Sequence, residues 1–329
     1  MEVLSTAVAH DTFGALVGRP GVEWLTLGSD GTLRDGSGSE VAAGDARPEV
    51  AWGTSDLFRQ GAPIGAFFGL LGSVPTLRWF ASPAAGYDHP VFADLARRGV
   101  RITNAHVNSV PIAEFVLRAV LDEFQGAQQW RDLAAERAWR VHDWREVSGT
   151  TWLVVGLGSI GSEVAIRARA FGAHVIGCRR TPSADDPADR TVTPDALPGV
   201  VGEADVVVLS APATPATRGL VDAGFLASMR PGSVLVNVSR GSLVDEDALL
   251  DALDGGAPGT AILDVFRDEP LPVDHPFRSH PSVRVTPHNA AGGIGRLRRQ
   301  AELFGDNLDR YLTGRPLLHD VTDQAAAGS

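Results

Sequence analysis

The stretch TWLVVGLGSIG, residues 151–161, is an apolar run that breaks into the pattern Gly-x-Gly-x-x-Gly. Residues 162–170 follow with helical spacing, and a second apolar run comes at 173–177. This order predicts a strand, a tight turn, a helix and a parallel strand, the context in which the glycine pattern binds a dinucleotide. A glycine turn with a purely structural role is the alternative.

Each glycine of the motif has its own expected part. Gly156 would allow the turn, Gly158 would let a backbone approach a pyrophosphate, and Gly161 would let the helix pack close to the strand. The N–H groups at the helix start, at Ser159 and Ile160, would face the anion. We therefore predict that all five residues contact the cofactor.

Composition restricts the class of protein. A chain of 329 residues with 44% apolar content has room for two globular domains. Its net charge of −11 argues against nucleic-acid binding, and we interpret Arg296, Arg298 and Arg299 as the solvated face of a helix. All 29 basic residues are Arg, which excludes Schiff-base chemistry and the phosphate-binding lysine of a P-loop.

Cysteine usage and hydropathy indicate the compartment. The single cysteine, Cys178, excludes an intramolecular disulfide framework, so a reducing, cytoplasmic location is the default. The longest apolar run, at 64–74, is far shorter than the roughly 20 residues that a membrane helix needs. We expect a soluble protein without a membrane partner, and we assign no metal ligands.

Residues 1–105 predict a small α/β unit. Short β-like runs at 22–27, 50–52, 77–80 and 100–103 alternate with helical patterns, and 28–46 is interpreted as a loop or hairpin. A helix begins near Asn108, and helical character is expected to continue to Trp144. The tryptophans are mostly expected to be core or interface anchors, but Trp130 and Trp139 look exposed, which suggests contact with another element or another subunit.

The part of the chain after the glycine motif predicts a doubly wound sheet. Further strand-like runs occur at 206–209, 234–238, 260–263 and 283–285, mostly separated by helical segments. A final helix is expected over 295–312, and residues 315–321 would return to the first domain.

Polar residues follow three of these strands directly. Arg240 follows the run at 234–238, Asp264 and Glu269 follow 260–263, and His288 follows 283–285. The carboxyl ends of parallel strands meet at one sheet edge, so these side chains should converge where the dinucleotide lies. A guanidinium binds a carboxylate, an imidazole gives a proton to a carbonyl oxygen, and a carboxylate on the far ring nitrogen would fix its tautomer. Each residue alone could be structural, but together they suit reduction of a 2-oxo acid by a nicotinamide.

At this point the sequence resembles the D-isomer-specific 2-hydroxyacid dehydrogenase family, from about residue 77 to 321. The resemblance implies that Arg240 anchors the substrate carboxylate and carbonyl, that His288 is the acid/base and that Glu269 is its partner. It also implies that Asp264 contacts the nicotinamide carboxamide. The matching stretches are 156–161, 233–241, 263–272 and 286–290.

The resemblance also implies a fold and further site residues. We expect two doubly wound parallel-sheet α/β domains, a Rossmann-type cofactor domain over 108–290 and a smaller, flavodoxin-like substrate domain formed by 1–107 and 291–329. A homodimer through the helices between Asn108 and Trp144 is also implied. Backbone N–H groups of the substrate-domain loop are expected to hold the substrate carboxylate, at Ala85, Gly86 and Tyr87. Further cofactor contacts are expected from Ala211, Pro212, Thr217, Val238, Ser239 and His288.

One departure from the family concerns the cofactor. Members that prefer NAD carry an acidic residue at the end of the second strand of the motif, where it binds the ribose hydroxyls. Here Arg179, Arg180 and Thr181 stand at that place. Two guanidiniums and a hydroxyl would bind a 2′-phosphate, so we predict that NADP(H) is preferred and that NAD(H) is possible. Two solvated arginines in a loop are the alternative.

These features predict an NADPH-dependent reductase of small 2-oxo acids, similar to glyoxylate and hydroxypyruvate reductases. A short phosphoglycerate dehydrogenase is a weaker alternative, because long versions carry a C-terminal regulatory domain and this chain ends soon after its last helix. A dinucleotide-sensing binding protein of the corepressor type is the alternative from another class. The full set of Arg240, Glu269 and His288 favours the enzyme.

Overall fold

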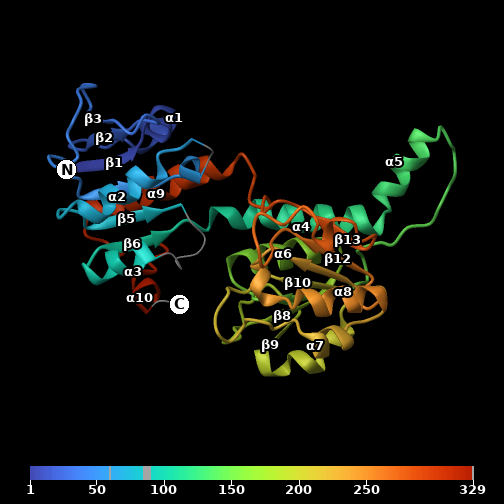
Figure 1. Ribbon diagram of the computed structural model, residues 1–329. Helices are drawn as coiled ribbons and strands as arrows, with labels where there is room; N and C mark the ends of the chain where they lie inside the picture. Colours follow the sequence, from blue (N-terminus) through green and yellow to red (C-terminus); the bar gives the residue numbers. More distant parts are fainter. Residues whose placement is uncertain (59–60, 84–89, 328–329) are drawn as a thin grey trace. The chain divides into compact units, whose positions relative to one another are not determined.

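The computed structural model describes residues 1–58, 61–83 and 90–327. The chain divides into two compact units, one formed by Met1–Val107 with Ile294–Ser329 and the other by Asn108–Gly293. Each unit is built on a sheet with flanking helices (Figure 1). Both sheets are wholly or mostly parallel, which confirms the predicted α/β class.

The first unit contains a six-stranded sheet in the order β3-β2-β1-β4-β5-β6. Among the strands that the structure describes, only β2 and β3 pair antiparallel. They form a hairpin whose second strand lies in the region 28–46 that was expected to be a loop or hairpin. The first strand was not predicted from the sequence. The strands are β1 (Glu2–Thr6), β2 (Glu23–Leu27), β3 (Leu33–Arg34), β4 (Val50–Trp52), β5 (Trp79–Ser82) and β6 (Arg101–Asn104).

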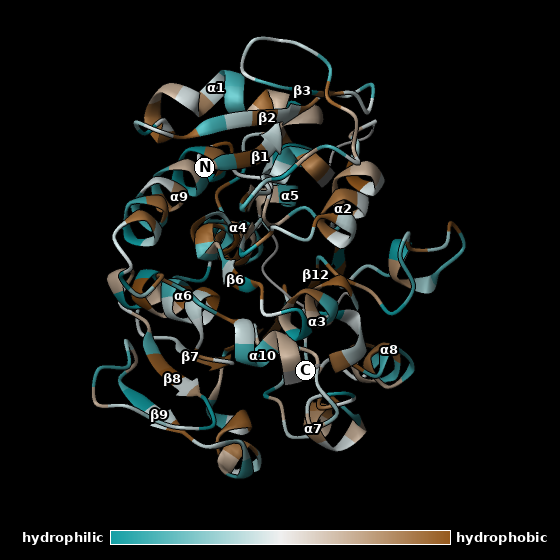
Figure 2. Ribbon diagram, turned by 90° about the vertical axis from the view of Figure 1, so that its left-hand side faces the viewer, coloured by the Kyte–Doolittle hydropathy of each residue, from teal (hydrophilic) through white to brown (hydrophobic). Residues whose placement is uncertain are grey.

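Helices cover both faces of this sheet. Successive strand residues alternate between two cores, because Val50 and Trp52 pack in the core that contains Phe304, whereas Ala51 packs in the core that contains Phe67. In Figure 2, α2 is largely apolar, while α9 carries both polar and apolar residues. The helices are α1 (Ala7–Val17), α2 (Ile64–Ser73), α3 (Pro90–Arg97), α9 (Arg296–Leu312) and α10 (Thr322–Ala327), so the expected final helix is followed by another.

Trp52 and Trp79 are core anchors, as expected for most of the tryptophans. Trp52 and Trp79 are buried and stack on Phe304, with ring centroids 4.7 and 5.3 Å apart. The prediction that Arg296, Arg298 and Arg299 form the solvated face of a helix is wrong. Arg298 is exposed and pairs with Glu302, but Arg299 is half-buried and donates to the carbonyl of Val107, so the three do not form one solvated face.

The second unit contains a seven-stranded, fully parallel sheet in the order β13-β12-β11-β10-β7-β8-β9. The chain starts in the middle at β7 and winds outward in both directions, as the glycine motif predicts. The three-residue edge strand β9 was not predicted. The strands are β7 (Thr151–Val155), β8 (His174–Cys178), β9 (Arg190–Val192), β10 (Val206–Leu209), β11 (Val234–Asn237), β12 (Thr260–Leu263) and β13 (Val283–Val285).

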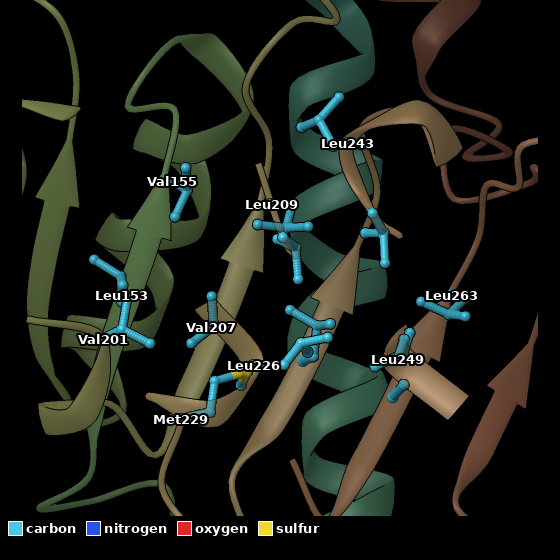
Figure 3. Packing of buried hydrophobic residues seen from close by; sticks show 14 of the residues in the cluster. Leu153, Val155, Val201, Val207, Leu209, Leu226, Met229, Leu243, Leu249 and Leu263 are labelled. Carbon is cyan, nitrogen blue, oxygen red and sulfur yellow. The ribbon is translucent and has the colours of Figure 1, made fainter. Parts of the chain in front are cut away.

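Burial on both faces explains why these strands are nearly all apolar. Leu153, Val155, Val207 and Leu209 point to one face, where they meet residues of α7 and α8 (Figure 3). Trp152 and its alternating neighbours point to the other face, against α4 and α6. The helices are α4 (Ser109–Phe124), α5 (Ala127–Ala135), α6 (Ser159–Ala170), α7 (Ala223–Ala227) and α8 (Glu246–Asp254).

The segment after α4 differs from the expectation of a helix continuing to Trp144. The helix α5 ends at Ala135, Arg137 adopts a φ of +57°, and the chain then folds back without regular structure. The indole of Trp130 donates to His142 at 2.7 Å, which ties the returning segment to α5. Figure 1 shows this arm standing away from the sheet of its own unit.

Short 3-10 helices connect several elements, at Ser55–Phe58, His106–Asn108, Pro194–Gly199, Val201–Glu203, Gly241–Leu243 and Pro276–Arg278. Within the described ranges, no helix combines the length and the apolar character needed to cross a bilayer.

Candidate functional site

The glycine turn joins β7 to α6. Gly156 has a φ of +98°, and a Cβ there would lie 2.4 Å from the backbone nitrogen of Ala211, so both turn and packing require glycine. A Cβ on Gly161 would lie 2.2 Å from the carbonyl oxygen of Gly156, which shows how closely the helix packs. Gly158 instead faces open space. The three glycines therefore stand in the geometry expected of a dinucleotide turn.

The start of α6 can receive an anion. Its first backbone bond runs from Ser162 N–H to the carbonyl of Gly158 at 2.8 Å, and Gly158 offers no side-chain cap. The N–H groups of the first turn, at Ser159 and Ile160, therefore lie at the positive end of a helix of twelve residues. A dinucleotide pyrophosphate fits these backbone donors and the open space at Gly158.

A chain of hydrogen bonds links the ends of β7, β10 and β11. Ser210 donates through its hydroxyl to the carbonyl of Gly156 at 2.8 Å, and Ser239 donates to the carbonyl of Ala211. Val238 is buried at the end of β11. Because these residues fix the strand ends to one another, the loops around the glycine turn have a defined shape.

The loop after β10 is closed by Thr217. Its hydroxyl donates to the carbonyl of Pro212 at 2.6 Å and accepts from the N–H of Thr214 at 2.8 Å. The predicted cofactor contacts Pro212 and Thr217 therefore lie on one hydrogen-bonded turn. In this structure the hydroxyl of Thr217 shapes the loop itself.

Arg240 follows β11 with extended backbone. Its Nη1 donates to the carbonyl of Ser239 at 2.8 Å, and its own carbonyl accepts from Asn237 at 3.0 Å. The next residue, Gly241, lies against another loop so closely that a Cβ would stand 1.9 Å from the carbonyl carbon of Phe266. The Arg240 turn and the loop that carries Glu269 are therefore in direct contact.

Glu269 and His288 form a hydrogen-bonded pair. Glu269 Oε2 lies 2.7 Å from His288 Nδ1, and Oε1 accepts from the N–H of Phe266 at 3.0 Å. Burial would raise the pKa of Glu269, but the hydrogen bonds from His288 and Phe266, with the charges of His288 and Arg240, hold it below its ordinary value. An ionised Glu269 keeps the proton on Nδ1, which leaves Nε2 as the nitrogen that can exchange a proton with a ligand.

Asp264 holds the turn that carries His288. Its carboxylate is buried and accepts from the hydroxyl of Thr286 at 2.6 Å and from the N–H groups of Asn289 and Ala290, each at 2.8 Å. Its backbone carbonyl also accepts from His288 N–H at 2.8 Å. These bonds hold His288 at a φ of +50°, a conformation unusual for a residue with a side chain. The carboxylate predicted to contact the nicotinamide thus has three partners within the protein.

Glu246, at the start of α8, is a residue that sequence reasoning missed. Its side chain is buried, accepts from the N–H of Arg267 at 2.8 Å, and lies 3.5 Å from Nε2 of His275. Through the bond to Arg267, it holds the loop between Asp264 and Glu269 against the start of α8. Acidic residues are common at the start of a helix, where they interact favourably with its N-terminal N–H groups, so the sequence gives no sign of this contact.

The ribose end of the expected cofactor site lies after β8. Arg179 is half-buried and pairs with Asp186 at 2.5 Å, while Arg180 and Thr181 are exposed. All three residues follow the strand as predicted. The contact with Asp186 was not anticipated, because it depends on the path of the loop between β8 and β9.

The predicted substrate loop falls outside the described residues, so Ala85, Gly86 and Tyr87 receive no structural account. At the carboxyl ends of β4, β5 and β6 lies a cavity of about 10 Å³. Its lining includes Trp52, Gly53, Ser82 and Gln300. Gln300 was not predicted, and its Nε2 has no hydrogen-bond partner among the described residues.

A family model of the "D-isomer specific 2-hydroxyacid dehydrogenase, NAD binding domain" matches residues 117–290. A glyoxylate reductase from Thermococcus gammatolerans is 33% identical over 259 residues, covering 74% of this chain and 75% of that protein. A D-3-phosphoglycerate dehydrogenase from Mycobacterium tuberculosis is 34% identical over 297 residues, covering 88% of this chain. The chain spans 52% of the length of that mycobacterial relative.

Solved structures with a similar fold carry names from the same family. A D-isomer specific 2-hydroxyacid dehydrogenase from Xanthobacter autotrophicus, in complex with NADPH and MES, has a TM-score of 0.75 at 31% identity, covering 98% of each chain. An NADPH-dependent glyoxylate/hydroxypyruvate reductase from Sinorhizobium meliloti, in complex with NADP and sulfate, has a TM-score of 0.75 at 25% identity. That alignment covers 100% of this chain and 99% of the other.

Fold and glycine turn together define a protein with a nicotinamide dinucleotide-binding domain. The chain belongs to the D-isomer specific 2-hydroxyacid dehydrogenase family.

Proposed function

We propose that this chain is a reductase that uses NADPH to convert a small 2-oxo acid to a D-2-hydroxy acid, with glyoxylate or hydroxypyruvate as the type of substrate. The observation that carries the proposal is the 2.7 Å contact between His288 and Glu269, on loops that adjoin the Arg240 turn. The names of the Thermococcus and Sinorhizobium relatives support the substrate class.

The roles of the side chains follow from their chemistry. When bound, the cofactor supplies the hydride. Arg240 binds the substrate carboxylate and carbonyl through its guanidinium, and His288 delivers a proton from Nε2 to the developing alkoxide. Glu269 holds the Nδ1 proton and stabilises the imidazolium before the transfer.

Other parts of the chain complete the proposed site. In the proposal, unit Asn108–Gly293 binds the cofactor and the other unit binds the substrate. Ala85, Gly86 and Tyr87 add backbone donors to the carboxylate, and Asp264 contacts the nicotinamide carboxamide in addition to holding the His288 turn.

We include NADP(H) as the preferred cofactor and NAD(H) as a possible one. Arg179, Arg180 and Thr181 lie at the end of β8, where the 2′-position of the adenine ribose binds in sheets of this type. The NADPH and NADP complexes of the Xanthobacter and Sinorhizobium proteins support this choice. A cytoplasmic location belongs to the same proposal.

We further propose a homodimer formed through the arm that follows α4. Trp130, Trp139 and Trp144 expose 45%, 97% and 47% of their surface on this arm. A hollow of about 350 Å³ is lined by residues of α4 and α5 and by Ile262, Arg284 and Thr286 near the β12–β13 edge. Sedimentation velocity should show a species of twice the chain mass, and a Trp139→Ser, Val141→Ser variant should shift it toward the monomer.

Phosphoglycerate oxidation is a second candidate, because the mycobacterial relative carries that name at 34% identity. The test is a panel of glyoxylate, hydroxypyruvate, pyruvate, 2-oxoisocaproate and phenylpyruvate with NADPH or NADH, together with 3-phosphoglycerate and NAD⁺ in the reverse direction. Turnover of 3-phosphoglycerate alone would replace the reductase proposal with this candidate.

The His288→Ala variant is the control for chemistry. It should lower kcat by about 10²–10⁴-fold, the usual contribution of general acid catalysis, while the dissociation constant of NADPH rises by less than about ten-fold, because His288 is only one of the proposed cofactor contacts. Binding of cofactor without turnover of any panel member by the parent protein would favour the dinucleotide-sensing alternative.

A further inference from the structure

The loop from Arg179 to Asp189 folds back onto the end of β8. Arg179 donates through its N–H to the carbonyl of Val192 at 3.1 Å, which holds the loop start against β9. Asp189 closes the loop by exchanging hydrogen bonds with Val175, at 2.8 and 2.9 Å. Both ends of the loop are therefore fixed to the sheet. The loop follows the end of β8, where the ribose end of the cofactor is proposed to bind.

This fold places Asp186 against Arg179. Asp186 Oδ1 lies 2.5 Å from Arg179 Nη1, and Oδ2 accepts from the N–H of Ser183 at 2.8 Å. The side chain of Asp186 is only 4% exposed, whereas that of Arg179 is 40% exposed. Burial opposes ionisation, but the bonds from Ser183 and Arg179 outweigh it and lower the pKa of Asp186. The pair is thus an ion pair with a shielded anion and an accessible cation.

The local charges follow from this pair. A guanidinium such as that of Arg179 can bind a 2′-phosphate, but Asp186 neutralises most of its charge at short range. Arg180 is exposed and has no carboxylate partner among the described residues. The attraction toward a phosphate at this edge is therefore weaker than two arginines in sequence suggest.

We propose that Asp186 is a specificity-determining residue that limits the preference for NADPH over NADH by neutralising Arg179. The inference rests on the proposed function, because it needs the 2′-phosphate to bind beside Arg179. Replacing Asp186 with a neutral residue leaves the full guanidinium charge facing the phosphate. NADH, which has no phosphate there, gains nothing from the change.

The experiment measures binding of NADP⁺ and NAD⁺ by isothermal titration calorimetry, independently of turnover. Asp186→Asn keeps the size of the side chain and one acceptor oxygen. It should raise the ratio of the NAD⁺ to the NADP⁺ dissociation constant by about five-fold, as expected for one charge several ångströms from the ligand. Asp186→Ala should act in the same direction, which keeps the test open if the amide misfolds the loop.

Asp185→Asn is the matched control. Asp185 is the adjacent aspartate, is exposed, and has no cationic partner among the described residues, so its removal makes the same change in net charge. It should alter the ratio by less than about two-fold, because exposed charges are screened.

Arg179→Ala separates the two proposals. If it lowers the ratio while neither Asp186 variant raises it, the role of Asp186 is refuted and NADPH preference stands. A lower ratio in both Asp186 variants would also refute it, showing that the carboxylate helps by orienting Arg179. If Arg179→Ala leaves the ratio unchanged, Arg179 does not bind the phosphate and the role of Asp186 is refuted as well. A ratio below one in the parent protein would instead refute the NADPH assignment itself.

Discussion

The carboxylate of Glu269 contacts two parts of the site and is influenced electrostatically by a third. It faces His288, accepts from the N–H of Phe266, and lies within the electrostatic influence of Arg240. Its pKa is lowered although burial works in the opposite direction. The residue therefore favours the folded state only when it is ionised.

The pH dependence of stability follows from that sign. A carboxyl whose pKa is lowered by folding stabilises the folded protein at pH values above 4.5, its ordinary pKa. This contribution is lost as the pH falls through the lowered pKa of the folded state. Glu269→Gln should thus be less stable than the parent at pH 6, and the difference should shrink as the medium is acidified. Urea denaturation at a series of pH values measures it, and a difference independent of pH would contradict the expectation.

At the scale of elements, the site depends on contacts between loops that follow different strands. Glu246 of α8 holds the Arg267 backbone, Gly241 lies against Phe266, and Asp264 holds the His288 turn. Together they fix the two loops that carry Glu269 and His288. The geometry of the Glu269–His288 pair therefore depends also on Glu246 and Gly241, for which no ligand contact is proposed.

The contribution of Glu246 can be measured. Glu246→Ala leaves the Arg267 N–H without its partner, so the free energy of unfolding should fall by about 1–3 kcal/mol. The pH profile of kcat should also shift, because Glu269 moves relative to His288. Glu246→Gln keeps an acceptor oxygen and should preserve that profile. Loss of stability with an unchanged profile in Glu246→Ala would show that the loop does not position the pair.

Several strands of the second sheet were predicted correctly from the sequence. Four strands, β7, β10, β11 and β12, are buried on both faces, so their apolar runs could be recognised in the sequence. Ligands bind at the carboxyl ends of such strands, and this rule selected Arg240, Glu269 and His288 as candidate residues. The pairing of His288 with Glu269 at 2.7 Å agrees with the implied partnership.

The remaining features depend on tertiary contacts. The edge strand β9 has three residues and a neighbour on one side only, so its sequence carries little strand signal. The arm beyond α5 was expected to be helical because its composition allows a helix, but Arg137 and the Trp130–His142 bond turn the chain back. The Asp186 contact depends on the path of an irregular loop, which no periodicity encodes.

At the scale of the whole molecule, the two units differ in how the chain forms them. Asn108–Gly293 is continuous in sequence, whereas the other unit combines both ends of the chain. The continuous unit has two core clusters of its own, one on each face of its sheet. It therefore contains the packing that a separate domain requires.

Residues 108–293 expressed alone should fold and bind NADP⁺. Circular dichroism with a cooperative thermal transition, and calorimetry giving a dissociation constant within about ten-fold of that of the full chain, would meet this expectation. The fragment should have no reductase activity, since the proposed substrate loop is absent. A fragment without a cooperative transition would show that the unit needs the rest of the chain.

The parallel order of the second sheet has a practical consequence for protein engineering. Every proposed ligand contact of this unit follows a strand, so the turns that precede the strands are available for insertions. The turn between α8 and β12 lies at that opposite edge, and Asp254 and Gly255 at its start are exposed. An affinity tag or a fluorescent reporter placed there would leave the chemistry of the other edge unchanged.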